Sequence, residues 1–247
     1  MRYLLHLSYS GKNYCGWQRQ DNAISVQETI EENLSKLLGA TTEIIGCGRT
    51  DAGVHAKNYY AHFDTEKLIV NDFLYRINSM LPEDIAIQNC IAVHANFHAR
   101  FDATARTYKY FIHFHKNPFN NDNSFCFRGE AIDMEQMNFC IQQLIGEHDF
   151  STFEKKGSDN KTSICLLEFA HWEKTADGLI FTITANRFLR NMVRRITATL
   201  LLVGQNKLNA EDVINAVLNQ QALDVKLAVP AKGLFLWNIE YEILKNL

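Results

Sequence analysis

A short glycine-rich segment presents a single carboxylate in a way that suits either a turn or catalysis. The segment reads Gly46-Cys47-Gly48-Arg49-Thr50-Asp51-Ala52-Gly53-Val54-His55-Ala56. Strand-like runs lie on both sides of it, at 42–47 and 58–64, so we expect a tight loop between two strands. Glycine permits positive φ angles and close approach of the backbone. From this pattern alone, Asp51 fits an Asx-turn as well as a catalytic group, and Arg49 beside it could hold a phosphate.

Tyr108 is a second residue that could take part in chemistry. It lies near the start of a strand expected at 107–115, whose even positions share one face, and this alternation favours a core side chain. Two basic residues, Arg106 and Lys109, flank it, and aromatic and basic residues are mixed between Phe97 and Phe127. Because unpaired RNA bases are commonly held by stacking on aromatic rings, a role in nucleic-acid binding stays open.

An arginine-rich segment near the C-terminal end predicts an amphipathic helix from Arg187 to Val203, ending at Gly204. Arg187, Arg190 and Arg194 would share the face opposite the apolar stripe, at spacing i, i+3 and i+7. Such a face is usually solvated. If it faces a carboxylate instead, Arg194 could pair with that group and lower its pKa.

Motifs for nucleotide cofactors and for metals fit poorly. Gly46-x-Gly48 begins like a dinucleotide fingerprint, but Asp51 occupies the position of the third glycine and a strand follows. The pairs His94/His98 and His113/His115 have no acidic or cysteine partner at ligand spacing, which favours ordinary polar roles. We therefore expect neither a nucleotide cofactor nor a metal.

Composition is that of a globular protein without a membrane segment. The chain has 247 residues with 47% hydrophobic content, and no apolar stretch is long enough to span a bilayer. Residues 1–20 run straight into strand-like alternation rather than a signal peptide, so we expect the cytosol. The six cysteines are scattered without a C-x-x-C pair, which argues against a zinc site or a disulfide framework.

The net charge of −3 does not by itself suggest a nucleic-acid binder, but the distribution of charge is uneven. The segment 185–195 holds four arginines and no acid. The segment 98–116 holds four arginines and lysines against a single acid, Asp102. Local basic clusters on such a chain can bind phosphates, although solvated surfaces explain them equally well.

The order of the expected elements predicts an α+β protein with two similar lobes. Strands are expected at 2–9, 42–47, 58–64, 85–93, 107–115, 163–172, 179–185 and 234–243. Helices are expected at 26–38, from 71 or 72 to 80, from 133 to about 144, at 187–203 and from 209 to 218, with a turn at 158–160. We expect lobes at 1–103 and 104–247, each a mixed or mostly antiparallel sheet backed by helices, with a catalytic cleft between them.

Several motifs in this order resemble those of the TruA-type tRNA pseudouridine synthases. The loop Gly48 to Ala56 is similar to the signature loop of that family. The resemblance continues in four further motifs: Tyr9-Ser10-Gly11 with Gly16-Trp17-Gln18-Arg19-Gln20, Phe97 to Phe101 with Ala105 to Tyr110, Phe188 to Ile196, and Pro230 to Leu236 with Tyr241. It therefore covers nearly the whole chain. Two departures, Ser10 in place of an acid and Thr197-Ala198 in place of a glycine-containing pair, bear on RNA contacts rather than on the chemistry.

This resemblance implies isomerisation of uridine to pseudouridine in the anticodon stem-loop of tRNA, at positions 38, 39 and 40. It implies that Asp51 is the catalytic aspartate and that Tyr108 stacks on the target base. Arg194 would be the basic partner of the aspartate, Arg49 would help to hold the extruded nucleotide, and Leu234 would contact the base from below. The family works as a homodimer on tRNA, in a two-lobed fold, and needs no metal or cofactor.

Two alternatives of other classes remain at this point. A non-catalytic RNA-binding module could use the same basic and aromatic surface, and its tRNA binding would survive loss of Asp51. A metal-dependent hydrolase could use the histidine pairs, and it would lose activity in a chelator.

Overall fold

The computed structural model describes residues 1–129, 131–155, 157, 161–223, 225 and 227–246. The chain divides into two compact units: Met1–Thr104 with Phe235–Leu247, called unit 1, and Ala105–Leu234, called unit 2. The turn expected at 158–160 lies outside the described residues. Within the described ranges, every helix falls short of the length and hydropathy that a bilayer crossing requires.

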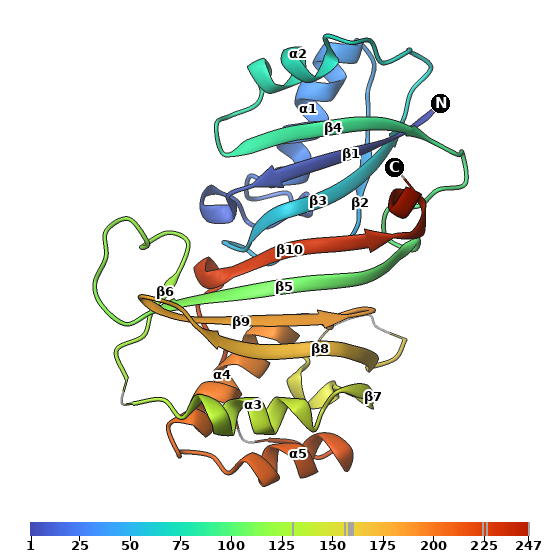
Figure 1. Ribbon diagram of the computed structural model, residues 1–247. Helices are drawn as coiled ribbons and strands as arrows, with labels where there is room; N and C mark the ends of the chain where they lie inside the picture. The colour runs from blue at the N-terminus through green and yellow to red at the C-terminus, as the bar shows by residue number, and fades with distance from the viewer. Residues whose placement is uncertain (130, 156, 158–160, 224, 226, 247) are drawn as a thin grey trace. The chain divides into compact units, whose positions relative to one another are not determined.

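Unit 1 combines a mostly antiparallel sheet with two α-helices (Figure 1). Strand β1 pairs antiparallel with β3 and β4, β2 pairs antiparallel with β3, and β10 pairs with β3 in parallel. Helix α1 contacts β2, and helix α2 contacts β4. The elements are β1 (Arg2–Tyr9), α1 (Val26–Leu38), β2 (Ile44–Gly46), β3 (His55–Asp64), α2 (Phe73–Met80), β4 (Ile85–Val93) and β10 (Leu234–Tyr241).

Unit 2 has the same kind of architecture. Strands β5, β9, β8 and β7 pair antiparallel in that order, and the short β6 pairs with β5 in parallel. Helix α3 contacts β8 and the helices α4 and α5. The elements are β5 (Ala103–His113), β6 (Phe125–Cys126), α3 (Met134–Gln142), β7 (Gly146–Asp149), β8 (Ile164–Lys174), β9 (Gly178–Ala185), α4 (Met192–Gly204) and α5 (Ala210–Leu218).

The predicted α+β class is confirmed, and local signals explain most helix bounds. The Ser25 hydroxyl accepts a hydrogen bond from the Glu28 backbone N–H at 3.2 Å, so α1 begins as the capping box predicts. The helix stops at Gly39, whose φ of 65° is the left-handed conformation that glycine adopts easily. Asp133 and Asn209 cap α3 and α5 in the same way through their side chains.

The expected arginine helix is wrong at its start. Helix α4 begins at Met192 rather than at Arg187, because Asn191 has a φ of 64° and interrupts the helical backbone. Asparagine is one of the few residues that tolerate this conformation. Arg187 and Arg190 therefore precede the helix, and the predicted arginine face at i, i+3 and i+7 does not form. Arg194 does lie on α4.

The C-terminal strand belongs to unit 1, whereas the expected division at 103/104 would assign it to the second lobe. Residues from Phe235 onward belong to unit 1, where Phe235 lies opposite His55 and Leu236 opposite Ala56 in the parallel pairing of β10 with β3. An apolar pattern identifies a strand but not its partner. Two short strands, β6 and β7, were not expected at all, and β5 starts earlier than expected, at Ala103.

In unit 1, the glycine-rich loop between β2 and β3 is held by the segment that follows β1. The Trp17 backbone N–H donates to the Thr50 carbonyl at 3.2 Å, and the Thr50 and Tyr9 hydroxyls form a buried hydrogen bond of 2.8 Å. On the strand side, the Tyr59 hydroxyl donates to the Gly48 carbonyl. The residues next to Asp51 are thus fixed from two directions, by one backbone hydrogen bond and by two tyrosine hydroxyls.

Two glycines make this close approach possible. A Cβ atom on Gly11 would lie 2.0 Å from the Val54 carbonyl oxygen, and one on Gly16 would lie 2.4 Å from the Thr50 carbonyl oxygen. Gly16 also has a φ of 106°, which disfavours any side chain. Only glycine lets the two backbones touch here, so the segment 11–16 shapes the loop that carries Asp51.

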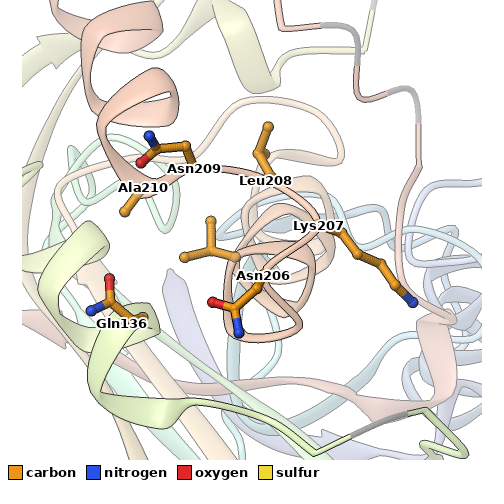
Figure 2. Close-up of a pocket in the computed structure, with 7 residues that line it drawn as sticks. Gln136, Asn206, Lys207, Leu208, Asn209 and Ala210 are labelled. Carbon is orange, nitrogen blue, oxygen red and sulfur yellow. The ribbon is translucent and has the colours of Figure 1, made fainter.

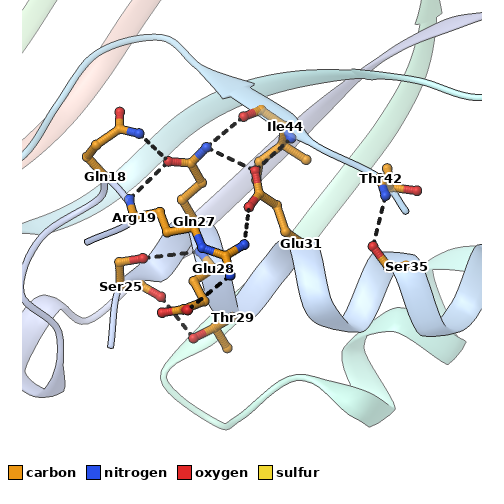
Figure 3. Close-up of polar contacts among 10 residues, drawn as sticks. All are labelled: Gln18, Arg19, Ser25, Gln27, Glu28, Thr29, Glu31, Ser35, Thr42 and Ile44. Atoms are coloured by element: carbon orange, nitrogen blue, oxygen red, sulfur yellow. Dashed lines mark hydrogen bonds and ion pairs between the residues drawn. The ribbon is translucent and has the colours of Figure 1, made fainter. Parts of the chain in front are cut away.

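A polar network ties the same segment to helix α1 (Figure 3). The Gln27 side-chain oxygen accepts from the Gln18 side chain at 2.8 Å and from the Arg19 backbone at 3.1 Å. Its amide nitrogen donates to the buried Glu31 carboxylate at 2.9 Å, and that carboxylate accepts from the Ile44 backbone at 3.0 Å. Helix α1 therefore positions both the loop after β1 and the strand that leads to Asp51.

We predict that Gly16→Ala lowers the free energy of unfolding by at least about 2 kcal/mol, because it adds both backbone strain and a clash with Thr50. Gly48→Ala is the matched control. A Cβ atom there would meet nothing within 4 Å, so stability should change by less than about 1 kcal/mol. Urea denaturation measures both, and equal effects of the two substitutions would contradict the proposed packing.

Candidate functional site

Asp51 lies on the expected loop between two strands of unit 1. Its side chain is half-buried, and its carbonyl accepts a hydrogen bond from the Val54 backbone at 3.1 Å, which closes a tight turn. Gly53 completes this turn with a φ of 78°. Arg49, two residues before the carboxylate, is exposed. The loop therefore presents one carboxylate, Asp51, and one cation, Arg49, from a backbone that is fixed on both sides.

His55, at the end of the loop, has a positioning role that the sequence did not reveal. Its buried ring stacks on Phe235 with centroids 4.5 Å apart, and its Nδ1 accepts from the Gly11 backbone N–H at 3.2 Å. Ser10, which departs from the family pattern, places its hydroxyl 3.4 Å from the same nitrogen. The histidine thus joins the loop, the segment after β1 and strand β10 within unit 1.

In unit 2, Tyr108 lies on β5 where the face that it shares with Tyr110 and Ile112 is less deeply buried. Tyr110 and Ile112 are in the core, whereas Tyr108 is half-buried. The Phe188 and Tyr108 rings pack in a T-shaped arrangement, with centroids 5.1 Å apart and an angle of 87° between the planes. This contact fixes the orientation of the tyrosine ring.

The short segment Val229–Gly233, which precedes β10 in the chain, accepts hydrogen bonds from helix α4 and from strand β5. We call it the strap. The Arg194 Nε donates to the Val229 carbonyl at 2.8 Å, and the Tyr110 hydroxyl donates to the Pro230 carbonyl at 2.8 Å. A Cβ atom on Gly233 would lie 2.7 Å from the Tyr110 ring, so the strap lies directly on that ring. Leu234 follows the strap and is buried.

The charge of Arg194 also acts on Tyr110. Burial raises the pKa of the Tyr110 hydroxyl, and the positive charge of Arg194 partly offsets this rise. Tyr110 therefore stays a neutral hydrogen-bond donor at physiological pH. The strap, Tyr110 and Arg194 form one connected group, with Tyr108 two positions away along β5.

The predicted site residues fall in both units. Asp51 and Arg49 belong to unit 1, and Tyr108, Arg194 and Leu234 belong to unit 2. The expected pairing of Arg194 with Asp51 joins the two units and stays a prediction, as does the expected cleft. The motif Pro230 to Leu236 includes most of the strap, but its hydrogen bonds to Arg194 and Tyr110 were not predicted, because they use backbone carbonyls rather than distinctive side chains.

Two pockets of unit 2 lie apart from these residues. The pocket in Figure 2 has a volume of about 320 Å³ and is formed where α3 meets the end of α4 and the start of α5. Asparagine and glutamine side chains and Lys207 line it, so it offers no carboxylate for catalysis. A second pocket of similar volume lies beside the loop that follows β5.

Two of the four histidines considered as metal ligands, His98 and His113, make hydrogen bonds. The His98 Nδ1 accepts from the Arg100 backbone at 3.1 Å, and the His113 Nδ1 is 2.9 Å from the Ser124 hydroxyl. Across the described ranges, no group of three or more histidine, cysteine or acidic residues could hold a metal ion.

Comparison with known proteins identifies the family. A model of the family described as tRNA pseudouridine synthase matches residues 7–102 and 140–242. These ranges contain the loop with Asp51 and Arg49, and also Arg194 and Leu234, whereas Tyr108 falls between them. The match thus includes residues of both units.

Curated relatives align with this sequence over nearly their whole length. A tRNA pseudouridine synthase A from Azobacteroides pseudotrichonymphae genomovar. CFP2 is 45% identical, with 99% of each chain aligned. The protein of that name from Bacteroides fragilis is 43% identical over 97% of this chain and 96% of its own. The one from Colwellia psychrerythraea is 36% identical over 98% and 94%. The chain therefore belongs to the tRNA pseudouridine synthase family, and is an isomerase whose substrate is tRNA.

Proposed function

We propose that this isomerase converts uridine to pseudouridine in the anticodon stem-loop of tRNA, at positions 38, 39 and 40, with Asp51 as the catalytic carboxylate. The observation that carries the proposal is the presentation of Asp51 on a loop whose neighbouring residues, Thr50 and His55, are both anchored. An anchored loop keeps a reacting group in position without reorganisation during the reaction.

The reaction rearranges one nucleotide without loss of any heavy atom. The bond between N1 of uracil and C1′ of the ribose breaks, the base rotates, and C5 bonds to C1′. The proton on C5 is released and N1 takes up a proton, so the reaction is balanced and requires no oxidant or cofactor. A carboxylate can assist as a nucleophile at the sugar or as a base.

The target uridine must leave the base stack before it can react, which costs a few kcal/mol. We propose that Tyr108 offsets this cost by stacking on the extruded base. Its ring is half-buried and packs in a T-shaped arrangement with Phe188, so little side-chain freedom is lost on binding. Leu234, buried directly after the strap, would give the base an apolar contact.

The two arginines have different proposed roles. Arg49 is exposed on the catalytic loop and would bind a phosphate of the extruded nucleotide. Arg194 would pair with the catalytic carboxylate and orient it. Its Nε bond to Val229 fixes the plane of the guanidinium, and a guanidinium has further donors on its two terminal nitrogens.

We predict that Asp51→Asn lowers the rate of tritium release from tRNA labelled at C5 of uridine by at least about 10³-fold. The amide has nearly the same shape but is neither a nucleophile nor a base. Binding of unmodified tRNA should change less than about threefold, since the charge of one residue is a small part of the interface. Near-normal tritium release would remove Asp51 from the proposed mechanism, and a tRNA-binding module without activity would show no release even from the unaltered chain.

We predict that Tyr108→Ala weakens tRNA binding by about tenfold, because stacking on one base is worth about 1–3 kcal/mol. Tyr108→Phe keeps the ring and should bind within about threefold of the unaltered protein. Filter binding in an Asp51→Asn background measures affinity without turnover. Equal affinities for the alanine and phenylalanine variants would show that Tyr108 does not stack on the substrate.

We also propose that the enzyme is a cytosolic homodimer. Apolar side chains on the outer face of β8 support a protein contact there: Ile164 is 46% exposed, Leu166 38% and Phe169 49%. On the same strand, Cys165, Leu167 and Ala170 face the core. A register shift between Leu167 and Phe169 preserves both apolar faces.

We predict that the double substitution Leu166→Asp with Phe169→Asp converts the dimer to a monomer, because two charges would be buried in the contact. Light scattering coupled to size-exclusion chromatography measures the molar mass. Tyr75→Asp on α2, where the side chain is 78% exposed, is the control. A dimer that persists in the double variant would place the contact elsewhere.

A further inference from the structure

The loop between β5 and β6 in unit 2 has no role in the proposed chemistry. It is the long green loop that follows β5 in Figure 1. It lies in the interval 103–139 that the family model does not match. Phe119 in this loop is 90% exposed, the largest exposed fraction among the large apolar side chains of the described residues. An aromatic ring exposed to this extent is accessible for stacking on a base.

A basic pocket of about 320 Å³ lies beside this loop. Lys116 and Arg128 line it, together with His113 and the amides of Asn117 and Asn121. Both cations are exposed, and within the residues that the structure describes neither forms an ion pair. The acid of the loop, Asp122, does not line the pocket. Amide and cationic donors of this kind are complementary to a phosphate.

The pocket is held in shape by hydrogen bonds. The Lys232 ammonium donates to the Asn121 carbonyl at 2.7 Å and to its side-chain oxygen at 3.2 Å. At the base of the loop, His113 contacts the Ser124 hydroxyl at 2.9 Å, and its carbonyl accepts from the Phe127 backbone at 2.8 Å. Lys232 belongs to the strap, so the pocket and Tyr110 are connected through the same short segment.

Burial and the positive charge of Lys232 both lower the pKa of His113. The imidazole at the pocket floor is therefore neutral at physiological pH. The positive charge of the site comes from Lys116 and Arg128 at its walls and from Lys232 behind Asn121. This arrangement suits an anion that enters from solvent.

We propose that this pocket binds a backbone phosphate of tRNA, and that Phe119 stacks on an unpaired base beside that phosphate. A cationic groove next to an exposed aromatic ring is the usual arrangement for single-stranded nucleic acid, whereas a small anion would not use the ring. His113 lies five residues beyond Tyr108 on β5, which corresponds to about 17 Å. The bound nucleotide is therefore distinct from the target uridine. The inference rests on tRNA being the substrate, not on the proposed target positions.

The test measures affinity and turnover separately with unmodified tRNA. Lys116→Ala with Arg128→Ala should raise Kd and KM by about tenfold and reduce the slope of log Kd against log salt by about 1, because one phosphate contact is lost. Phe119→Ala should raise Kd by about tenfold, and Phe119→Trp should restore binding. In all three variants kcat should stay within about twofold.

The charge-matched control is Lys36→Ala with Lys174→Ala, two exposed lysines on α1 and β8, and Tyr75→Ala is the control for an exposed ring. An unchanged Kd and salt slope in the loop variants would overturn the inference. So would a loss of kcat alone, or a change in oligomeric state that makes Phe119 part of a protein contact. Asp51→Asn separates this inference from the proposed catalytic role of Asp51, because it tests turnover while leaving the loop between β5 and β6 intact.

Discussion

The structure around Asp51 depends on one constraint, the direct contact of two stretches of backbone in unit 1. Gly11 and Gly16 leave no room for a Cβ atom against the carbonyls of Val54 and Thr50. The contact lets backbone groups, rather than flexible side chains, set the conformation of the loop. Helix α1 supports it through Gln27, and His55 supports it from the other side. A carboxylate placed in this way needs little reorganisation to react.

Unit 2 uses a related device with different parts. The strap accepts hydrogen bonds from Arg194 on α4 and from Tyr110 on β5, and Lys232 within it reaches the loop after β5. Hydrogen bonds of the strap therefore join helix α4, strand β5 and the basic pocket. The pocket that we propose for tRNA is thus connected to Arg194 and to the strand that carries Tyr108.

Local chemistry made part of this predictable from the sequence. Ser25, Glu28 and Gly39 mark the ends of α1, and the glycines around Asp51 indicated its loop, because caps and turns depend on neighbouring residues. The interruption of the helix at Asn191 was not predicted, since a single left-handed residue hardly disturbs an apolar pattern that continues across it. The pairing of β10 with β3 joins distant parts of the chain, and the strap acts through carbonyls that every residue has. Neither leaves a signature in residue types.

We propose one reaction on one region of tRNA, supported by an anchored loop that carries Asp51, by the packing of Tyr108 against Phe188 and by the family assignment. The measurement that tests it most directly is a mass-spectrometric map of pseudouridine in tRNA from cells with and without this protein, complemented by the unaltered chain or by Asp51→Asn. We predict that pseudouridine at positions 38, 39 and 40 disappears when the protein is absent and returns only with the unaltered chain. Pseudouridine that persists at these positions without the protein, or that returns with Asp51→Asn, would contradict it.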